Sequence, residues 1–290
     1  MATRIFMAFP GFKKKAFTMS YDDGVAQDKR LIAIMQKYGL KGTFNINSDL
    51  FGDTPGQEKG RMPESEAIEL YTSSGNEVAV HGARHLSLSM VDSAVAVNDV
   101  IEDRKNLEKL LKKPVKGMAY ANGSGATNKQ VAQMMKACGI LYSRTTASSH
   151  SFALPETLDD WLLLPATCHH NDSQLFELGK KFVEWTQPGY FWGGAAQMFY
   201  LWGHSYEFDN NDNWERIEQF AQYIGGREDI WYATNMEIYQ YVRAYDMLEW
   251  TVDGGTVYNP TNTDIYVDYY KKKVLIKAGE TVNLNEAKGL

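Results

Sequence analysis

Two adjacent carboxylates and two histidines four residues apart are the groups in this chain best suited to chemistry. Asp22 and Asp23 follow the apolar run 17–21 and precede a glycine. Once the backbone turns at a strand end, one of these carboxylates can hold a metal while its neighbour takes a proton. His81 and His85 follow a second apolar run, and their spacing lets two imidazoles reach one ion.

Each pattern taken alone is weak. Asp-Asp-Gly is most often a solvated turn, and a lone His-x-x-x-His pair is little more specific. Together, at the ends of two predicted strands, they favour one site, because unrelated surface decoration would rarely place both at equivalent points of a fold.

Three segments resemble motifs of the polysaccharide deacetylases, which carry the nodulation-type deacetylase domain of carbohydrate esterase family four. Residues 20–24 are similar to the first motif, 81–85 to the second, and 197–204 to the last, in which a histidine follows an apolar strand. The resemblance covers roughly residues 14–245.

The resemblance implies a role for each matching residue. Asp22 would be the general base and His204 the general acid, whereas Asp23, His81 and His85 would bind a divalent metal. This ligand set suits Zn²⁺, and Co²⁺, Ni²⁺ or Mn²⁺ could take the same positions.

The third motif departs from the family. Its strand end, 118–123, has Ala, Ala and Asn where the family has Arg, Pro and Tyr. Asp22 therefore needs another cationic partner, for which Arg84 is a candidate. The backbone N–H of Asn122 could still stabilise an oxyanion, and Tyr120 is a candidate for substrate contact.

Further candidates lie in the second half of the chain. Asp160 and Trp161 are the loose counterpart of a fourth motif, whose Asp orients the acid His. His169 and His170 follow another apolar run and could contact substrate or bind a further metal ion. Two tryptophans, Trp192 and Trp202, are candidate platforms for a sugar ring.

Length and composition indicate one enzyme domain outside the nucleic-acid-binding and membrane classes. The chain has 290 residues, a net charge of −6 and two cysteines, which argue against a nucleic-acid surface and a disulfide framework. It has neither an apolar signal core near its start nor a run of about 20 apolar residues. Cytoplasmic residence is therefore expected.

Apolar runs alternate with helical patterns, which predicts an α/β fold with parallel strands. We expect a distorted (β/α) barrel of about seven parallel strands over residues 1–248 and a small β-rich extension over 249–290. The extension is a packed strand pair, an oligomer contact or a sugar-binding appendage. The strands are expected at 15–21, 42–47, 77–81, 115–120, 140–144, 162–166, 197–203 and 229–234.

The function implied by the resemblance is metal-dependent removal of acetyl groups from N- or O-acetylated sugars or oligosaccharides. Three alternatives stay open: an acetyl-ester esterase on xylan-like oligosaccharides, a metal-independent amidohydrolase of ring ureides with the same fold, and a non-catalytic sugar-binding barrel.

Overall fold

In the computed structural model, the structure describes residues 5–54, 60–123, 127–186, 195–270, 272–287 and 289. The strands are β1 (Ile5–Ala8), β2 (Lys15–Asp22), β3 (Gly42–Ile46), β4 (Glu77–Val80), β5 (Gly117–Ala119), β6 (Tyr142–Ser148), β7 (Leu164–Ala166), β8 (Cys168–His169), β9 (Gln197–Gly203), β10 (Ile230–Tyr232), β11 (Glu249–Trp250), β12 (Thr256–Tyr258), β13 (Ile265–Tyr269), β14 (Lys272–Ile276) and β15 (Thr281–Asn283). The helices are η1 (Pro10–Phe12), α1 (Asp28–Lys37), α2 (Glu64–Ser73), α3 (Ser93–Leu111), α4 (Lys129–Ala137), α5 (Leu158–Trp161), α6 (Leu175–Glu184), α7 (Tyr206–Asn210), α8 (Trp214–Ile224) and α9 (Asn235–Asp246). None of the described helices combines the length and apolar character needed to cross a bilayer.

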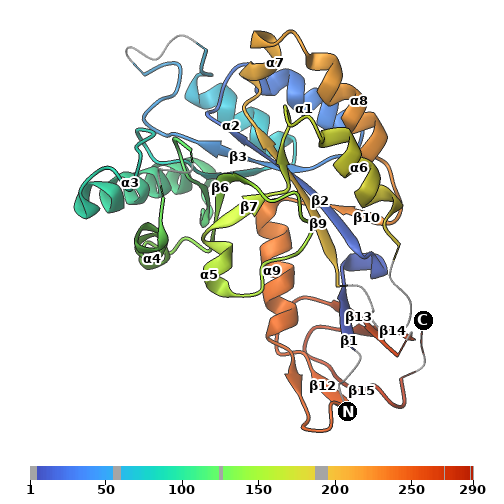
Figure 1. The fold of residues 1–290 in the computed structure, drawn as a ribbon. Coiled ribbons are helices and arrows are strands. Elements are labelled where there is room, and N and C mark those ends of the chain that lie inside the picture. The colour runs from blue at the N-terminus through green and yellow to red at the C-terminus, as the bar shows by residue number, and fades with distance from the viewer. Residues whose placement is uncertain are drawn as a thin grey trace.

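β2 lies in the middle of a nine-stranded sheet (Figure 1). The strands are hydrogen-bonded in the order β7-β6-β5-β4-β3-β2-β9-β8, and β10 also pairs with β2. Every pairing in this sheet is parallel among the described residues. All eight residues of β2 are buried, as expected of a parallel strand covered on both faces. The predicted α/β fold with a barrel-like parallel sheet is confirmed.

The segment 164–169 brings the two edges of this sheet together. Its first part, β7, pairs with β6, and its second part, β8, pairs with β9. Only Thr167 separates them, and its backbone N–H donates to the carbonyl of Tyr200 on β9 at 2.8 Å. The sequence predicts one strand here, over 162–166, because the two residues of β8 are too few to show a strand period.

Helix packing holds the central strands in place. α8 presents apolar residues at helical spacing to the sheet, and Phe220 lies 6.3 Å from Phe17 of β2 and 5.7 Å from Phe199 of β9, between ring centroids. Polar side chains at the carboxyl ends of β2 and β9 therefore project from strands that are fixed by the core. The residues that α8 buries are Trp214, Ile217, Phe220, Ala221 and Ile224.

The C-terminal residues form two small antiparallel sheets, as the β-rich pattern predicts. One has the order β11-β12-β15 and the other the order β1-β13-β14. The boundary predicted after residue 248 assigns β1 to the barrel, whereas in the structure β1 pairs with β13. Figure 1 shows α9 running from the large sheet toward these strands. The Tyr241 hydroxyl of α9 donates to the carbonyl of Ala8 at 2.6 Å and accepts from the N–H of Tyr266 at 3.0 Å.

Candidate active site

Asp22 and Asp23 lie at the carboxyl end of β2. Asp22 is the last residue of the strand and pairs in register with Asn45 of β3. Asp23 has a φ of 84°, which non-glycine residues seldom adopt. Because the chain turns here, two consecutive carboxylates line the same pocket instead of pointing to opposite faces of the sheet. Backbone strain of this kind is typical of functional sites.

The protonation of His81 follows from its hydrogen bond. This residue directly follows β4, and its Nδ1 lies 2.9 Å from the carbonyl oxygen of Ala119. Since a carbonyl can only accept, Nδ1 carries the proton and Nε2 keeps a free lone pair. Nε2 is buried, and it has no hydrogen-bond partner among the described residues. This is the tautomer that binds a metal through Nε2.

A three-residue ligand set surrounds that nitrogen. Asp23, His81 and His85 each place one donor atom within 4.8 Å of the others. His85 Nε2 lies 3.4 Å, and His81 Nε2 3.8 Å, from Asp23 Oδ1. Arg61 Nη2 holds the same oxygen at 3.2 Å. Two imidazoles and one carboxylate match the donor set of zinc sites that keep open coordination positions, so these residues fit a divalent cation.

Arg144 takes the place of the arginine missing from the third motif. It lies on β6 and is paired in register with Ala119, the alanine that stands where the family has Arg. Its guanidinium, fully buried, donates to Asp22 Oδ2, to Ser20 Oγ at 3.2 Å and to its neighbour's backbone carbonyl. The guanidinium beside Asp22 therefore comes from β6 instead of from the neighbouring strand β5. The proposed partner Arg84 is wrong for this role, because its Nε pairs with Asp99 at 2.9 Å.

The charge of Arg144 determines the ionisation of Asp22. Burial alone would raise the pKa of Asp22, but Arg144, together with His81 and His204, outweighs it and lowers the pKa to about 2. Asn45 Nδ2 donates to the other carboxylate oxygen at 2.8 Å. Asp22 is thus ionised across the neutral range and has modest basicity.

His204 directly follows β9 and lies between two carboxylates. Its Nε2 is 3.8 Å from Asp22 Oδ2, and its Nδ1 is 2.8 Å from Glu207 Oε1 on α7. A carboxylate accepts here, so Nδ1 carries a proton and Nε2 faces the pocket. Burial lowers the pKa of His204, but the hydrogen bond to Glu207 and the charges of Asp22 and Asp23 raise it above its ordinary value. This suits a residue that gives up a proton near neutral pH.

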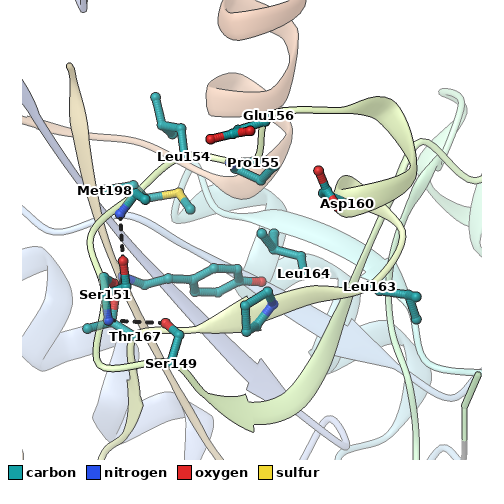
Figure 2. A pocket seen from close by; sticks show the side chains of 13 residues that line it. Ser149, Ser151, Leu154, Pro155, Glu156, Asp160, Leu163, Leu164, Thr167 and Met198 are labelled. Carbon is teal, nitrogen blue, oxygen red and sulfur yellow. Dashed lines mark hydrogen bonds between the residues drawn. The ribbon is translucent and has the colours of Figure 1, made fainter.

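The fourth-motif assignment is corrected by this geometry. Asp160 closes a capping box with Thr157 at the start of α5, and it lies at a separate cavity of about 340 Å³, shown in Figure 2. Trp161 is buried against Tyr239, with ring centroids 5.2 Å apart. Glu207, not Asp160, is the carboxylate that holds His204.

One pocket of about 360 Å³ brings the predicted residues together. Asp22, His85, Asn122 and His204 all line it although 182 positions (204 − 22) separate the first from the last. Its full lining is Asp22, Asp23, His81, His85, Tyr120, Asn122, Gly123, Thr146, Trp202, His204 and Tyr206.

The third-motif turn is fixed to the second motif. Asn122 has a φ of 65°, and its side-chain amide donates to the carbonyl of His85 at 2.8 Å. Tyr120 lines the pocket, but its hydroxyl donates a hydrogen bond to the carbonyl of Leu162 at 2.9 Å. Burial raises the pKa of Tyr120 to about 12, so this phenol stays neutral.

The remaining candidates divide between the pocket and its surroundings. Trp202 lines the pocket and is 8 % exposed, with Arg144 at 4.4 Å from its ring centroid. A tryptophan this buried offers the pocket an edge more readily than a full stacking face. His169 and His170 lie behind it in a second cluster with Glu207. Trp192 lies outside the described residues.

Sequence reasoning missed Arg144, Glu207 and Tyr206. The signal for Arg144 was present, because a charged residue ends the strand predicted at 140–144. Glu207 follows His204 by three residues, a spacing that brings side chains together in a helical turn. The Tyr206 ring lies tilted beside the His204 ring, with centroids 5.1 Å apart, and no local pattern distinguishes it from a core tyrosine.

Comparison with known proteins agrees with the fold and the motifs. Residues 10–143 match the family model for polysaccharide deacetylases, a class of hydrolases acting on acetyl groups of carbohydrates. The resemblance carried by the first and second motifs is confirmed over the matched residues, which have the sequence pattern of a polysaccharide deacetylase domain. The match ends before His204. No curated protein matches the chain.

Solved structures share the architecture over most of the chain. A candidate polysaccharide deacetylase from Mycobacterium smegmatis is 18% identical, with a TM-score of 0.56, and the alignment covers 84% of this chain and 96% of that one. A candidate polysaccharide deacetylase from Pseudomonas aeruginosa is 16% identical, with a TM-score of 0.57 and coverages of 80% and 92%. A Puue allantoinase is 13% identical, with a TM-score of 0.55 and coverages of 80% and 91%. At these identities the comparison supports the fold.

Proposed function

We propose that this protein is a metal-dependent deacetylase of N- or O-acetylated sugars or oligosaccharides. The observation that carries the proposal is His81: its Nδ1 donates to the Ala119 carbonyl, while its Nε2 is buried, lacks a hydrogen-bond partner within the described ranges and lies 3.8 Å from Asp23 Oδ1. Such a lone pair is costly to bury without a ligand. Zn²⁺ suits this donor set, and Co²⁺, Ni²⁺ and Mn²⁺ are alternatives for the same ligands.

Asp22 is proposed as the general base. A divalent cation held by Asp23, His81 and His85 would polarise the acetyl carbonyl and lower the pKa of the attacking water, which reduces the basicity required of Asp22. Asp22 takes one proton from that water as its oxygen adds to the carbonyl carbon. Arg144 keeps the carboxylate ionised and oriented for this transfer.

His204 is proposed as the general acid. Its Nδ1 is held by Glu207, so the proton for the leaving group is carried by Nε2, the nitrogen that faces the pocket. When the carbon–nitrogen bond breaks, Nε2 gives this proton to the departing amine, or to the sugar oxygen of an ester, and acetate remains. The backbone N–H of Asn122 is proposed to stabilise the negative charge on the carbonyl oxygen.

Acetate release from a panel of N- and O-acetylated oligosaccharides tests the proposal. The protein is stripped of metal, reloaded with Zn²⁺ and compared with Asp22→Asn and Asp23→Asn. Asp22→Asn should keep the metal and lose a factor of about 10² or more, since a general base contributes 10²–10⁴-fold. Asp23→Asn should lose metal affinity. Asp159→Asn is the matched control, because that exposed carboxylate pairs with Lys136 away from the pocket.

The same panel separates the alternatives. Release from O-acetyl substrates alone would identify an acetyl-ester esterase. Full activity after metal removal would contradict the proposal and favour the metal-independent ureide amidohydrolase. The allantoinase that shares this fold makes that alternative worth testing. Sugar binding without turnover on any substrate would identify a binding barrel.

A further inference from the structure

A second cluster of metal-binding residue types lies beside the pocket. His169 ends β8, His170 follows it, and Glu207 comes from α7 on the neighbouring connection. The Nε2 atoms of the two histidines are 3.1 Å and 3.0 Å from Glu207 Oε2. One donor atom from each of the three residues lies within 4.8 Å of the others.

His170 is held rigidly by its neighbours, and the Tyr21 hydroxyl lies 3.2 Å from its Nδ1. Its side chain is fully buried, and its Nε2 has no hydrogen-bond partner of acceptable geometry among the described residues. The ring stacks on Phe208 at 4.1 Å and on Tyr21 at 5.7 Å. Gly203 is required beside it, because a Cβ there would come within 2.0 Å of His170 Nδ1. The ring therefore points its Nε2 at Glu207 without being able to turn away.

The spacing of the donors matches a cation. Ligands about 2.0–2.1 Å from a tetrahedral zinc ion lie roughly 3.3 Å from one another, close to the 3.0 and 3.1 Å found here.

We propose that His169, His170 and Glu207 bind a second divalent transition-metal cation, next to the site formed by Asp23, His81 and His85. Both sites offer two imidazoles and one carboxylate, a donor set suited to Zn²⁺. Glu207 links them functionally, because its Oε2 belongs to the second site while its Oε1 holds His204. The inference does not depend on the deacetylase assignment.

The alternative occupant is a proton. Asn171 donates its backbone N–H to His169 Nδ1 at 3.1 Å, which places the proton of the metal-free imidazole on Nε2, where it can be donated to Glu207. Binding a cation at Nε2 requires the other tautomer, so the contact from Asn171 must break. Metal loading should therefore change His169 Nδ1 from a hydrogen-bond acceptor to a protonated nitrogen, which ¹⁵N NMR of the imidazole detects.

Counting bound Zn²⁺ tests the proposal. The stripped protein is loaded with excess Zn²⁺, passed through a desalting column and analysed by mass spectrometry of the metal. We expect about two equivalents in the original protein, about one in the His81→Ala,His85→Ala variant, about one in His169→Ala, and none when these changes are combined. If the His81→Ala,His85→Ala variant retains one equivalent of Zn²⁺, that ion occupies the second site, and the result does not depend on any deacetylase activity.

Controls separate loss of ligand from loss of fold. His150→Ala removes an exposed imidazole that pairs with Asp172 at 2.7 Å on the adjacent loop, and it should leave the count unchanged. Glu207→Gln keeps the side-chain shape and should lose the same equivalent as His169→Ala, with circular dichroism confirming the fold. A count unchanged in both His169→Ala and Glu207→Gln, or an acceptor-type Nδ1 that persists in the loaded protein, would overturn the inference and assign the cluster to shared protons.

Discussion

Replacing Arg144 with Met should expose how strongly this buried cation is coupled to Asp22. Both side chains are almost completely buried. The pKa of Asp22 falls from an ordinary 3.8 to about 2 despite burial, and this difference corresponds to roughly 2 kcal/mol in favour of the charged carboxylate. Because desolvation acts in the opposite direction, the combined attraction to Arg144, His81 and His204 is larger, and Arg144 makes the largest contribution to it. Arg144→Met leaves a buried carboxylate unpaired and should lower the free energy of unfolding by about 3–5 kcal/mol.

A double-mutant cycle in urea, followed by circular dichroism on metal-free protein, measures the coupling. Asp22→Asn leaves Arg144 buried without its partner, so it should also be costly. The double variant removes both charges and should cost at least about 2 kcal/mol less than the sum of the single changes. Arg243→Met, which breaks a surface pair with Asp246, should cost less than about 1 kcal/mol. Additive losses at Arg144 and Asp22 would refute the reasoning.

Three further outcomes follow from the site. Glu207→Gln removes the charge that raises the pKa of His204, so the basic limb of the pH–rate profile should move to lower pH; an unmoved limb would contradict the acid role. Gly203→Ala places a Cβ about 2.0 Å from His170 Nδ1 and should lower unfolding stability by about 1–3 kcal/mol, whereas Gly289→Ala, with contacts of 3.4 Å or more, should not. His81→Ala should reduce the metal content of the first site, and unchanged content in that variant would exclude His81 as a ligand.

The residues recognised from the sequence are those in which chemistry and strand ends coincide along the chain. Asp22 and His81 directly follow apolar runs, and Asp23 and His85 come one and four residues later, so parallel-strand geometry places all four at one edge of the sheet. His204 follows the same rule at the end of β9. A local pattern is sufficient for these positions, because the alternation of strands and helices makes all the strands run in the same direction.

The partners of these residues depend on contacts between strands, which a local pattern does not contain. Arg144 reaches Asp22 because β6 pairs with β5 in a register that sets it beside Ala119. Arg84 is nearer in sequence to the second motif, yet it turns to Asp99 on α3. Asp160 satisfies a helix start instead of orienting His204. Arg144 and Arg84 are chemically equivalent cations, and Glu207 and Asp160 are equivalent carboxylates. Contacts between distant parts of the chain determine which of each pair lies in the site.

The junction between β7 and β8 makes the seam of the barrel part of the site. A single residue, Thr167, lies between the strand that pairs with β6 and the strand that carries His169. Side chains alternate faces along a strand, so a one-residue insertion at this seam would turn His169 toward the opposite face. An insertion or deletion is therefore tolerated much less here than in an ordinary surface loop. The same short segment closes the sheet and positions the imidazole pair beside Glu207.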